Sequence, residues 1–439
     1  MSFRLSACIA VSCAALALSS CAKLTLAWAD LDGKGDPAAP EVLGDFDGAP
    51  PVETAAAWRE TRAPELRAAL QKQVYGFLPE ASQTRVLDHK VVNPSAFGGK
   101  AVLEEYRLAL TATFAGVAVE TTGAADNDGD IVMNVAYPTH ANGPAPVILM
   151  ETFCRRWDTL PDPAVAGAPS PLKPAGGVET YVFGRFICTP PVADILDAGY
   201  AIATIFPSEV VPDRRESGLA ELRRLSPGHG DDETRWGAVA AWAWAYSRMI
   251  DVLENDPRID QSAIVTWGHS RYGKSALLAA AFDDRIDGVI AHQSGTGGAS
   301  LNRRKKGESV KSITAAYPHW FAGAYARFAG REEDMVVDQH QLLALIAPRP
   351  VLLGNARRDV WSDPGGAFRA AVGADPAYEL LGSEGLEQDR LDGWRPEADL
   401  AFWIRPGTHG VVKEDWPAFL EFLDAHFGGG EPVTKALSE

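Results

Sequence analysis

The chain has 439 residues, of which 46% are hydrophobic and 23% charged, a composition typical of globular proteins with a large core. Its formal net charge is −17 at pH 7, and the densest basic run, at residues 303–306, holds only four cations. Nucleic-acid binding needs a sustained basic face, so this charge balance argues against a nucleic-acid partner.

The first 29 residues predict an export signal. Arg4 supplies a positive start, and residues 7–18 form an apolar run that is short for a bilayer span. Two processing sites follow. The segment ending at Cys21 is similar to a bacterial lipobox, whose cysteine would carry a lipid anchor, and residues 27–29 offer an A-x-A cleavage site. We expect an exported protein, either periplasmic, anchored to the outer membrane or secreted, and the sequence leaves the processing site open.

Turn residues and composition divide the rest of the chain. Residues 30–53 are rich in Ala, Pro, Gly and Asp and predict a linker or extended arm, and residues 431–439 predict a tail. Residues 54–430 are expected to form one domain. Within it, residues 158–192 read as a Pro/Gly-rich insertion and residues 208–232 as a polar loop.

Apolar spacing predicts alternating helices and strands along the domain. Helical periodicity is found at residues 55–73, 193–198, 233–253, 275–282 and 416–427. Strand patterns are found at residues 102–114, 131–137, 146–153, 200–206, 263–267, 286–291, 350–354 and 400–404. The first two strands alternate enough to suggest an antiparallel edge, whereas the later strands are apolar throughout. Such strands, separated by helices, predict an α/β fold with a mostly parallel sheet covered on both faces, a three-layer sandwich.

The segment Gly268-His269-Ser270-Arg271-Tyr272-Gly273-Lys274-Ser275 fits two incompatible motifs. Its letters match the phosphate loop G-x-x-x-x-G-K-[ST]. They also place Ser270 two residues after a glycine, between a strand and a helix, as in an esterase nucleophile elbow. A phosphate loop favours small residues, and an exported protein meets little ATP, so an NTPase is the weaker interpretation. Tyr272 departs from the usual G-x-S-x-G, because the second glycine comes one position later.

A serine nucleophile needs a histidine base and an acid that orients it. In α/β-hydrolases these residues follow the serine in the order acid, then histidine. Asp359 comes five residues after the predicted strand at 350–354, and His409 follows the strand at 400–404. Asp363 is a competing acid, and Glu308 is a more distant one. The sequence holds no H-E-x-x-H motif or close His/Asp cluster, so we expect no metal or cofactor.

These residues resemble the glucuronoyl esterases, carbohydrate esterase family 15 of the α/β-hydrolase superfamily. The family motif G-C-S-R-x-G-K, in which bacterial members often replace the cysteine by histidine, is matched by residues 268–274. The resemblance spans roughly residues 230–412. It also includes residues 293–298, 307–310, 318–321, 338–340, 347–350, 359–361 and 408–410.

The resemblance implies a role for each matching residue. Ser270 would attack the ester carbonyl, and His409 would act as general base and then as general acid. Arg271 would stabilise the oxyanion through its backbone N–H and its guanidinium. The resemblance also indicates which residue is the acid of the triad. Fungal members carry that acid where this chain has Gln293, and other bacterial members carry it at the position of Asp359. We therefore expect Asp359 to be the acid.

The resemblance also implies a sugar-binding set, in which Lys274, Glu308 and Trp361 would contact the uronate. His269 is expected to point into the fold. Gln339 and His340 are expected either to line the pocket or to buttress it.

The expected activity is that of a serine carboxylesterase acting on esters of glucuronic acid or its 4-O-methyl ether, as in cross-links between lignin and glucuronoxylan, through an acyl-enzyme on Ser270. The alternatives are an acetyl xylan esterase or another small-ester hydrolase of the same fold, and an inactive glycan-binding lipoprotein. Cys154 and Cys188 are the cysteines beyond the leader, and they predict either a disulfide or two buried thiols.

Overall fold

The computed structural model describes residues 41–428, except residues 45, 47, 49, 125–128, 142, 174 and 175. The predicted export signal, the lipobox at Cys21 and the predicted tail lie outside the described residues. Part of the predicted linker is folded onto the domain: Val42 is buried, and its carbonyl accepts a hydrogen bond from Arg62 Nε at 3.0 Å. Among the described residues, none of the helices combines the length and apolarity that crossing a membrane requires.

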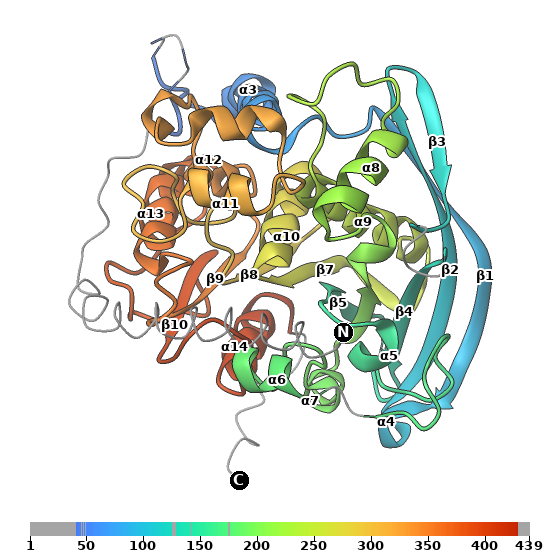
Figure 1. The fold of residues 1–439 in the computed structure, drawn as a ribbon. Helices are drawn as coiled ribbons and strands as arrows, with labels where there is room; N and C mark the ends of the chain where they lie inside the picture. Colours follow the sequence, from blue (N-terminus) through green and yellow to red (C-terminus); the bar gives the residue numbers. More distant parts are fainter. Residues whose placement is uncertain are drawn as a thin grey trace, which may run out of the picture.

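A central sheet runs through the described part of the chain (Figure 1). Its ten strands follow the order β1-β2-β4-β6-β5-β7-β8-β9-β10, with β3 paired to β2. The strands are β1 (Ala81–Ser95), β2 (Ala101–Phe114), β3 (Val117–Thr121), β4 (Ile131–Pro138), β5 (Ala145–Glu151), β6 (Ala201–Ile205), β7 (Ile259–His269), β8 (Gly288–His292), β9 (Val351–Ala356) and β10 (Leu400–Arg405).

The sheet has an antiparallel part and a parallel part. β1 to β4 pair antiparallel with one another, and β4 pairs antiparallel with β6. From β6 through β5, β7, β8 and β9 to β10, every pairing is parallel. β6, β8 and β9 are buried at every position, which explains why their sequences show no alternation. The mostly parallel α/β sheet predicted from the sequence is therefore confirmed.

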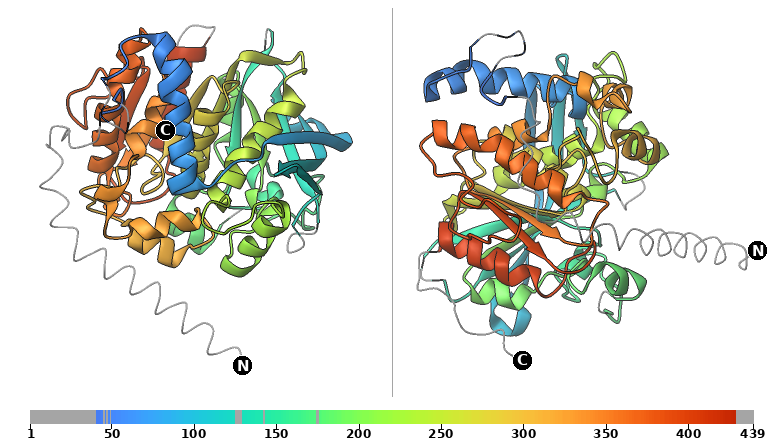
Figure 2. Two further views of the ribbon diagram at one scale, coloured as in Figure 1. Left: turned by 90° about the horizontal axis from the view of Figure 1, so that it is seen from above. Right: turned by 90° about the vertical axis from the view of Figure 1, so that its left-hand side faces the viewer.

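Helices cover both faces of the sheet (Figures 1 and 2). One face carries α9 (Ala238–Leu253), α10 (Arg271–Phe282), α12 (Gln339–Ala344) and α13 (Pro364–Leu380); the other carries α7 (Val192–Asp197) and α14 (Asp415–Phe427). The remaining helical segments are α2 (Ala55–Ala57), η1 (Trp58–Arg62), α3 (Ala63–Leu70), η2 (Gln71–Tyr75), α4 (Ala96–Gly99), α5 (Arg156–Thr159), α6 (Val178–Phe183), η3 (Pro207–Glu209), α8 (Arg215–Leu225), α11 (Val310–Ala316), η4 (Gly323–Phe328) and η5 (Glu332–Asp334).

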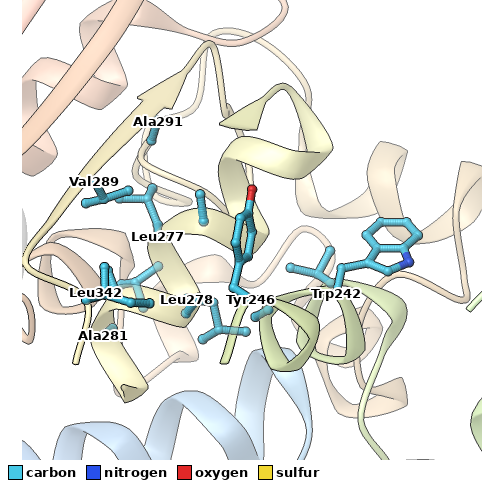
Figure 3. Packing of buried hydrophobic residues seen from close by; sticks show 14 of the residues in the cluster. Trp242, Tyr246, Leu277, Leu278, Ala281, Val289, Ala291 and Leu342 are labelled. Atoms are coloured by element: carbon cyan, nitrogen blue, oxygen red, sulfur yellow. The ribbon is translucent and has the colours of Figure 1, made fainter. Parts of the chain in front are cut away.

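The core under α9 and α10 fixes the position of the loop between β7 and α10. Figure 3 shows Tyr246 of α9 beside Leu277 and Leu278 of α10, with Trp242 of α9 on the other side of Tyr246. All four side chains are buried, and the Tyr246 hydroxyl donates to the carbonyl of Trp267 in β7 at 2.7 Å. The aromatic residues of α9 thus pack in the core, and the Tyr246 hydrogen bond ties α9 to the strand that precedes α10.

Several elements differ from the sequence predictions. β1 and β3 were not predicted, because β1 is an edge strand with mostly exposed side chains and therefore lacks an apolar pattern. The predicted polar loop at 208–232 contains α8, of which only Gly218, Leu222 and Leu225 are buried. The helix predicted from residue 233 begins at Ala238, because Gly237 is extended with φ −89° and ψ 172°. The helix predicted at 275–282 begins at Arg271, immediately after Ser270.

Candidate active site

Ser270 occupies a strained turn between β7 and α10. Its φ of 56° and ψ of −119° are rare for a residue with a side chain. The turn requires glycine two positions earlier: a Cβ on Gly268 would lie 1.9 Å from the carbonyl oxygen of Tyr272. The Ser270 backbone N–H donates to the His292 carbonyl of β8 at 2.8 Å, which ties the turn to the neighbouring strand. This geometry is that of a nucleophile elbow.

Tyr272, the residue that departs from the usual motif, faces the core. Its side chain is buried, and its ring lies 4.7 Å from that of Phe153 and 5.3 Å from that of Trp242, measured between centroids. The delayed glycine also has a reason, because a Cβ on Gly273 would lie 3.0 Å from the Gly268 carbonyl oxygen and 3.1 Å from the Cβ of Ser294. The bulky residue therefore anchors α10, and Gly273 lets the helix approach the strand.

His409 and Asp359 meet where β10 and β9 end. His409 Nδ1 donates to Asp359 Oδ2 at 2.7 Å, and the Ser362 backbone N–H donates to Asp359 Oδ1 at 3.3 Å. Burial alone would raise the pKa of Asp359, but the charge and hydrogen bond of His409 and the bonds from Ser362 hold that pKa below its usual value. The carboxylate therefore stays ionised and fixes the His409 tautomer, leaving Nε2 to exchange a proton.

The competing acid faces elsewhere. Asp363 caps α13, accepting the Gly366 N–H at 2.9 Å, and its Oδ2 lies 3.8 Å from the Nζ of Lys305. In the part of the chain that the structure describes, Asp359 is the acid hydrogen-bonded to His409. Gln293, at the position of the fungal acid, accepts the Gly410 N–H at 2.8 Å and so supports the His409 loop.

His269 points into the fold as expected, and it also contacts His409. Its side chain is buried, its Nδ1 lies 3.1 Å from Nδ1 of His292, and its ring centroid lies 4.6 Å from that of His409. Burial, together with the charges of the neighbouring His409 and His292, holds the pKa of His269 well below its usual value. A neutral imidazole thus packs beside His409.

Arg271 begins α10, where backbone N–H groups are unpaired and the helix dipole favours negative charge. Its guanidinium Cζ lies 4.9 Å from the centroid of the Trp320 ring, and Nη1 donates to Asp213 Oδ2. Burial alone would lower the pKa of Arg271, but the charge of Asp213 outweighs it and the pKa is raised. Nothing in the sequence pointed to Asp213, because it lies in the stretch read as a polar loop.

Lys274, Glu308 and Trp361, the predicted sugar-binding set, form one group beside α10. The ammonium of Lys274 is buried and donates to the carbonyls of Ser294 and Thr296, the latter at 2.8 Å. Burial lowers the pKa of Lys274 to about 8, although Glu308 opposes the shift. Two of the three ammonium donors are thus engaged by main-chain carbonyls, which leaves one for a ligand.

Glu308 connects the buried lysine with an exposed aromatic ring. Burial raises the pKa of Glu308 above its usual value, and Lys274, Lys305 and a hydrogen bond with Trp361 oppose that shift. The Glu308 backbone N–H donates to the Trp361 carbonyl at 2.8 Å. The Trp361 side chain remains 51% exposed, unusual for so large an apolar surface and suited to covering a ring.

The insertion forms a rim above His409. Phe183 of α6 lies edge-on to the His409 ring with centroids 6.5 Å apart, and its carbonyl accepts the Val411 N–H at 2.7 Å. Cys154 and Cys188 form a disulfide, with Cα atoms 5.2 Å apart, which resolves the question that the sequence left open. The disulfide joins the loop after β5 to the far end of the insertion.

Gln339 buttresses the structure behind the site: its Nε2 donates to the Tyr75 hydroxyl at 2.8 Å and to the Gly298 carbonyl at 2.7 Å. His340 is buried as well. Among the described residues, no three His, Cys, Asp or Glu side chains are grouped so as to hold a metal ion.

Comparison with known proteins gives consistent matches. A family model described as glucuronyl esterase, fungi, matches residues 229–382. A carbohydrate esterase from an unknown prokaryotic organism is 30% identical over 413 residues, covering 89% of this chain and 90% of that protein. A 4-O-methyl-glucuronoyl methylesterase from Phanerochaete carnosa is 29% identical over 256 residues, covering 54% of this chain and 63% of that protein.

Solved structures agree over nearly the whole chain. A glucuronoyl esterase from Solibacter usitatus is 32% identical, with a TM-score of 0.72, and the match covers 89% of this chain and 98% of the other. A promiscuous esterase of carbohydrate esterase family 15, from a marine bacterial metagenome, is 28% identical with a TM-score of 0.72, covering 90% of this chain and all of the other.

Proposed function

Because the chain belongs to carbohydrate esterase family 15, the glucuronoyl esterases, we propose that it hydrolyses esters of glucuronic acid or its 4-O-methyl ether through an acyl-enzyme on Ser270. The observation that carries the mechanism is the hydrogen bond of His409 to a buried, ionised Asp359. The His409 ring lies 4.6 Å from that of His269, the residue that precedes Ser270 and its strained turn. The proposed substrates are the esters that join glucuronoxylan to lignin alcohols.

Each step has a residue that can perform it. His409 Nε2 takes the proton of the Ser270 hydroxyl as its oxygen attacks the ester carbonyl, and Asp359 stabilises the imidazolium. The oxyanion forms beside the first N–H of α10 and the guanidinium of Arg271. His409 then gives its proton to the departing alcohol. Water, activated by the same histidine, releases the uronate from Ser270.

The sugar-binding set supports the choice of acyl group. An exposed aromatic ring at Trp361 can cover the sugar ring, while the carboxylate of Glu308 can accept from its hydroxyls and Lys274 has one donor free. An acetyl group offers neither a ring nor hydroxyls. An acetyl group would therefore make no use of these side chains as an acyl-binding site, so we favour the uronate.

The test compares two esters and one variant. Purified protein is incubated with benzyl glucuronate and with acetylated xylan, and release of benzyl alcohol and of acetate is measured for the wild type and for Ser270→Ala. We expect uronate hydrolysis that is lost in the variant. Acetate release without uronate cleavage would make the protein an acetyl xylan esterase, and uronate cleavage that survives Ser270→Ala would refute the mechanism. Binding of glucuronoxylan without any cleavage would leave the glycan-binding alternative.

We also propose that the protein is exported. The predicted signal at the N-terminus supports this, and so does the disulfide, because disulfides persist mainly in oxidising compartments. Mass spectrometry of the mature N-terminus tests the proposal. A lipidated Cys21 would place the protein on a membrane, cleavage after Ala29 would release it, and an intact leader would contradict export.

A further inference from the structure

Residues 318–321, Pro-His-Trp-Phe, belong to the segments that resemble the family, yet neither the triad nor the sugar-binding set uses them. In the structure, His319 and Trp320 follow α11 and face the loop after β6. There both side chains meet the carboxylate of Asp213. That carboxylate also contacts Arg271, so the segment reaches the active site through one intermediate residue.

Asp213 receives hydrogen bonds on both of its oxygens. His319 Nε2 donates to Oδ1 at 3.0 Å, and Trp320 Nε1 donates to the same oxygen at 2.7 Å. Arg271 Nη1 donates to Oδ2. The carboxylate is thus held by the His319 and Trp320 rings on one side and presents its other oxygen to the guanidinium.

Asp213 is ionised at neutral pH. Burial works against ionisation, but the bonds from His319 and Trp320 and the charge of Arg271 outweigh it and lower the pKa of Asp213 to about 2. A permanent anion therefore balances the guanidinium before a substrate arrives.

The guanidinium is also enclosed by aromatic rings. Its Cζ lies 4.9 Å from the Trp320 ring centroid, 5.3 Å from that of Phe153 and 5.9 Å from that of Tyr317. An arginine side chain has many rotamers, and transition-state stabilisation requires its donors to be in place before charge develops. Trp320 acts twice here, since its ring lies against the guanidinium while its N–H holds the carboxylate.

We propose that Asp213 is the positioning residue of the oxyanion site: it fixes the Arg271 guanidinium beside Ser270, and His319 and Trp320 fix Asp213. This inference rests on the proposed function, because it assigns to Arg271 a part in stabilising the oxyanion. A positioning role differs from that of a purely structural ion pair, because the loss of Asp213 should then change kcat only through its effect on Arg271.

Asp213→Asn is the informative change. Asparagine keeps the shape, but every partner of Asp213 is a donor, so its NH2 group must face either Arg271 or the two rings. We expect kcat for benzyl glucuronate to fall by roughly 10- to 100-fold, with KM nearly unchanged. The upper value is the loss in kcat that removing one oxyanion donor would cause. A rise in KM with kcat unchanged would show that Asp213 serves ground-state binding and would overturn the proposal.

A double-mutant cycle separates positioning from structure. Arg271→Ala should itself lower kcat on the order of 100-fold. In that background, Asp213→Asn should have no further effect, because the side chain that it positions is gone. Independent, multiplying losses would overturn the proposal. Should Asp213→Asn fail to fold, Trp320→Phe takes its place in the same cycle, since it removes one donor and keeps a ring.

Asp251 provides a matched control. It also accepts from three donors: Arg285 Nη1 at 2.8 Å, Arg248 Nη2 at 3.3 Å and Thr84 Oγ1 at 2.6 Å. It lies on α9 where that helix meets β1, so Asp251→Asn should lower thermal stability without changing kcat. An equal loss of kcat in both variants would mean that any such pair is required, and Asp213 would have no special role.

The two proposals fail in different ways. If Ser270→Ala keeps full activity, the proposed function is wrong whatever Asp213 does. If the wild type releases acetate from acetylated xylan and does not cleave the uronate ester, the proposed substrate class is wrong. The same double-mutant cycle is then measured with acetylated xylan. If Arg271→Ala leaves kcat unchanged while Ser270→Ala abolishes it, the esterase stands and the positioning role of Asp213 falls.

Discussion

The parallel and the antiparallel parts of the sheet contain different kinds of polar residue. Ser270, Asp359 and His409 all follow parallel strands, and so does Asp213. Parallel strands end at one edge, so the loops after β6, β7, β9 and β10 converge there. Antiparallel strands end alternately at opposite edges, and the polar residues of β1 and β2 lie along the strands instead.

Charges in the two parts are also satisfied differently. In the antiparallel part, both oxygens of the Glu104 carboxylate on β2 have a partner: Arg258 Nη1, just before β7, lies 2.6 Å from Oε1, and His89 Nε2 lies 2.8 Å from Oε2. In the parallel part, Lys274 and Glu308 are buried with pKa values shifted against their charged forms. Shifted groups of this kind are expected where a ligand completes the set of contacts. Changes in the parallel part should therefore alter catalysis, and changes in the antiparallel part should alter stability alone.

The largest effect is expected for Asp359→Asn. Asparagine would hydrogen-bond to His409 but favour the wrong tautomer, so kcat should fall on the order of 10³- to 10⁴-fold, as in other triads. Steady-state hydrolysis of benzyl glucuronate measures the change. Asp363→Asn is the matched control: it weakens the cap of α13 and should leave kcat within a few-fold. A larger loss for Asp363→Asn would move the acid to that residue.

Gly268→Ala should come next. The added Cβ would meet the backbone of Tyr272 at 1.9 Å, so the elbow must shift. A displacement of about 1 Å at a reacting group can cost on the order of 100-fold in rate, and we expect kcat to fall by that amount. Gly143→Ala, at a position with no atom within 4 Å of the added Cβ, should leave kcat unchanged. Equal rates for the two variants would show that the turn has room for a side chain.

A smaller effect should appear in the pH dependence of KM. Because the pKa of Lys274 is about 8, its ammonium loses a proton as the pH rises through that value. If the charged form binds the sugar, KM for the uronate ester should rise by up to about tenfold between pH 7 and pH 9, since about one tenth of the lysine then remains protonated. Lys274→Met should show a KM that is high and flat over this range. A flat KM in the wild type would remove Lys274 from the binding set.

The smallest effect on catalysis is expected for Arg258→Gln, which removes a partner of Glu104 in the antiparallel part. The change leaves the buried Glu104 carboxylate with weaker partners and removes a cation 3.6 Å from the centroid of the Tyr137 ring. Arg258 is partly exposed, so we expect a loss of only about 1–2 kcal/mol in the free energy of unfolding. Urea titration measures the loss, and kcat should be unaltered. A change in kcat would contradict the division between the two parts of the sheet.

The sequence predicted the parallel part of the sheet well and the antiparallel part incompletely. Buried strands such as β9 and β10 are short apolar runs, and the structure places both within one or two residues of the prediction. β1 was missed because its side chains are mostly exposed. α13 was missed because it is built from small residues and contains Pro376, which obscures helical periodicity.

The site residues that could be predicted are those with a local sequence pattern, and those that could not are defined by contacts between distant segments. Ser270, Asp359 and His409 could be named because each follows an apolar strand in the order that the chemistry requires. Asp213 could not, since it lies 58 residues from Arg271 and more than 100 residues from His319 and Trp320. The contact of His269 with His409 is likewise a product of the fold, and no local pattern announces it.

The rim of the site is fastened at two places. A side chain at Gly184 or Gly410 would collide with the backbone of the opposite loop, at 2.2 Å from Val411 O and 2.3 Å from Phe183 O, so the insertion and the His409 loop are interlocked. The Cys154–Cys188 disulfide holds the C-terminal end of the insertion to the loop after β5. Lifting the insertion would therefore displace His409, the proposed general base. Because these contacts are made during folding, the entropy of ordering the two loops is lost once rather than at every turnover.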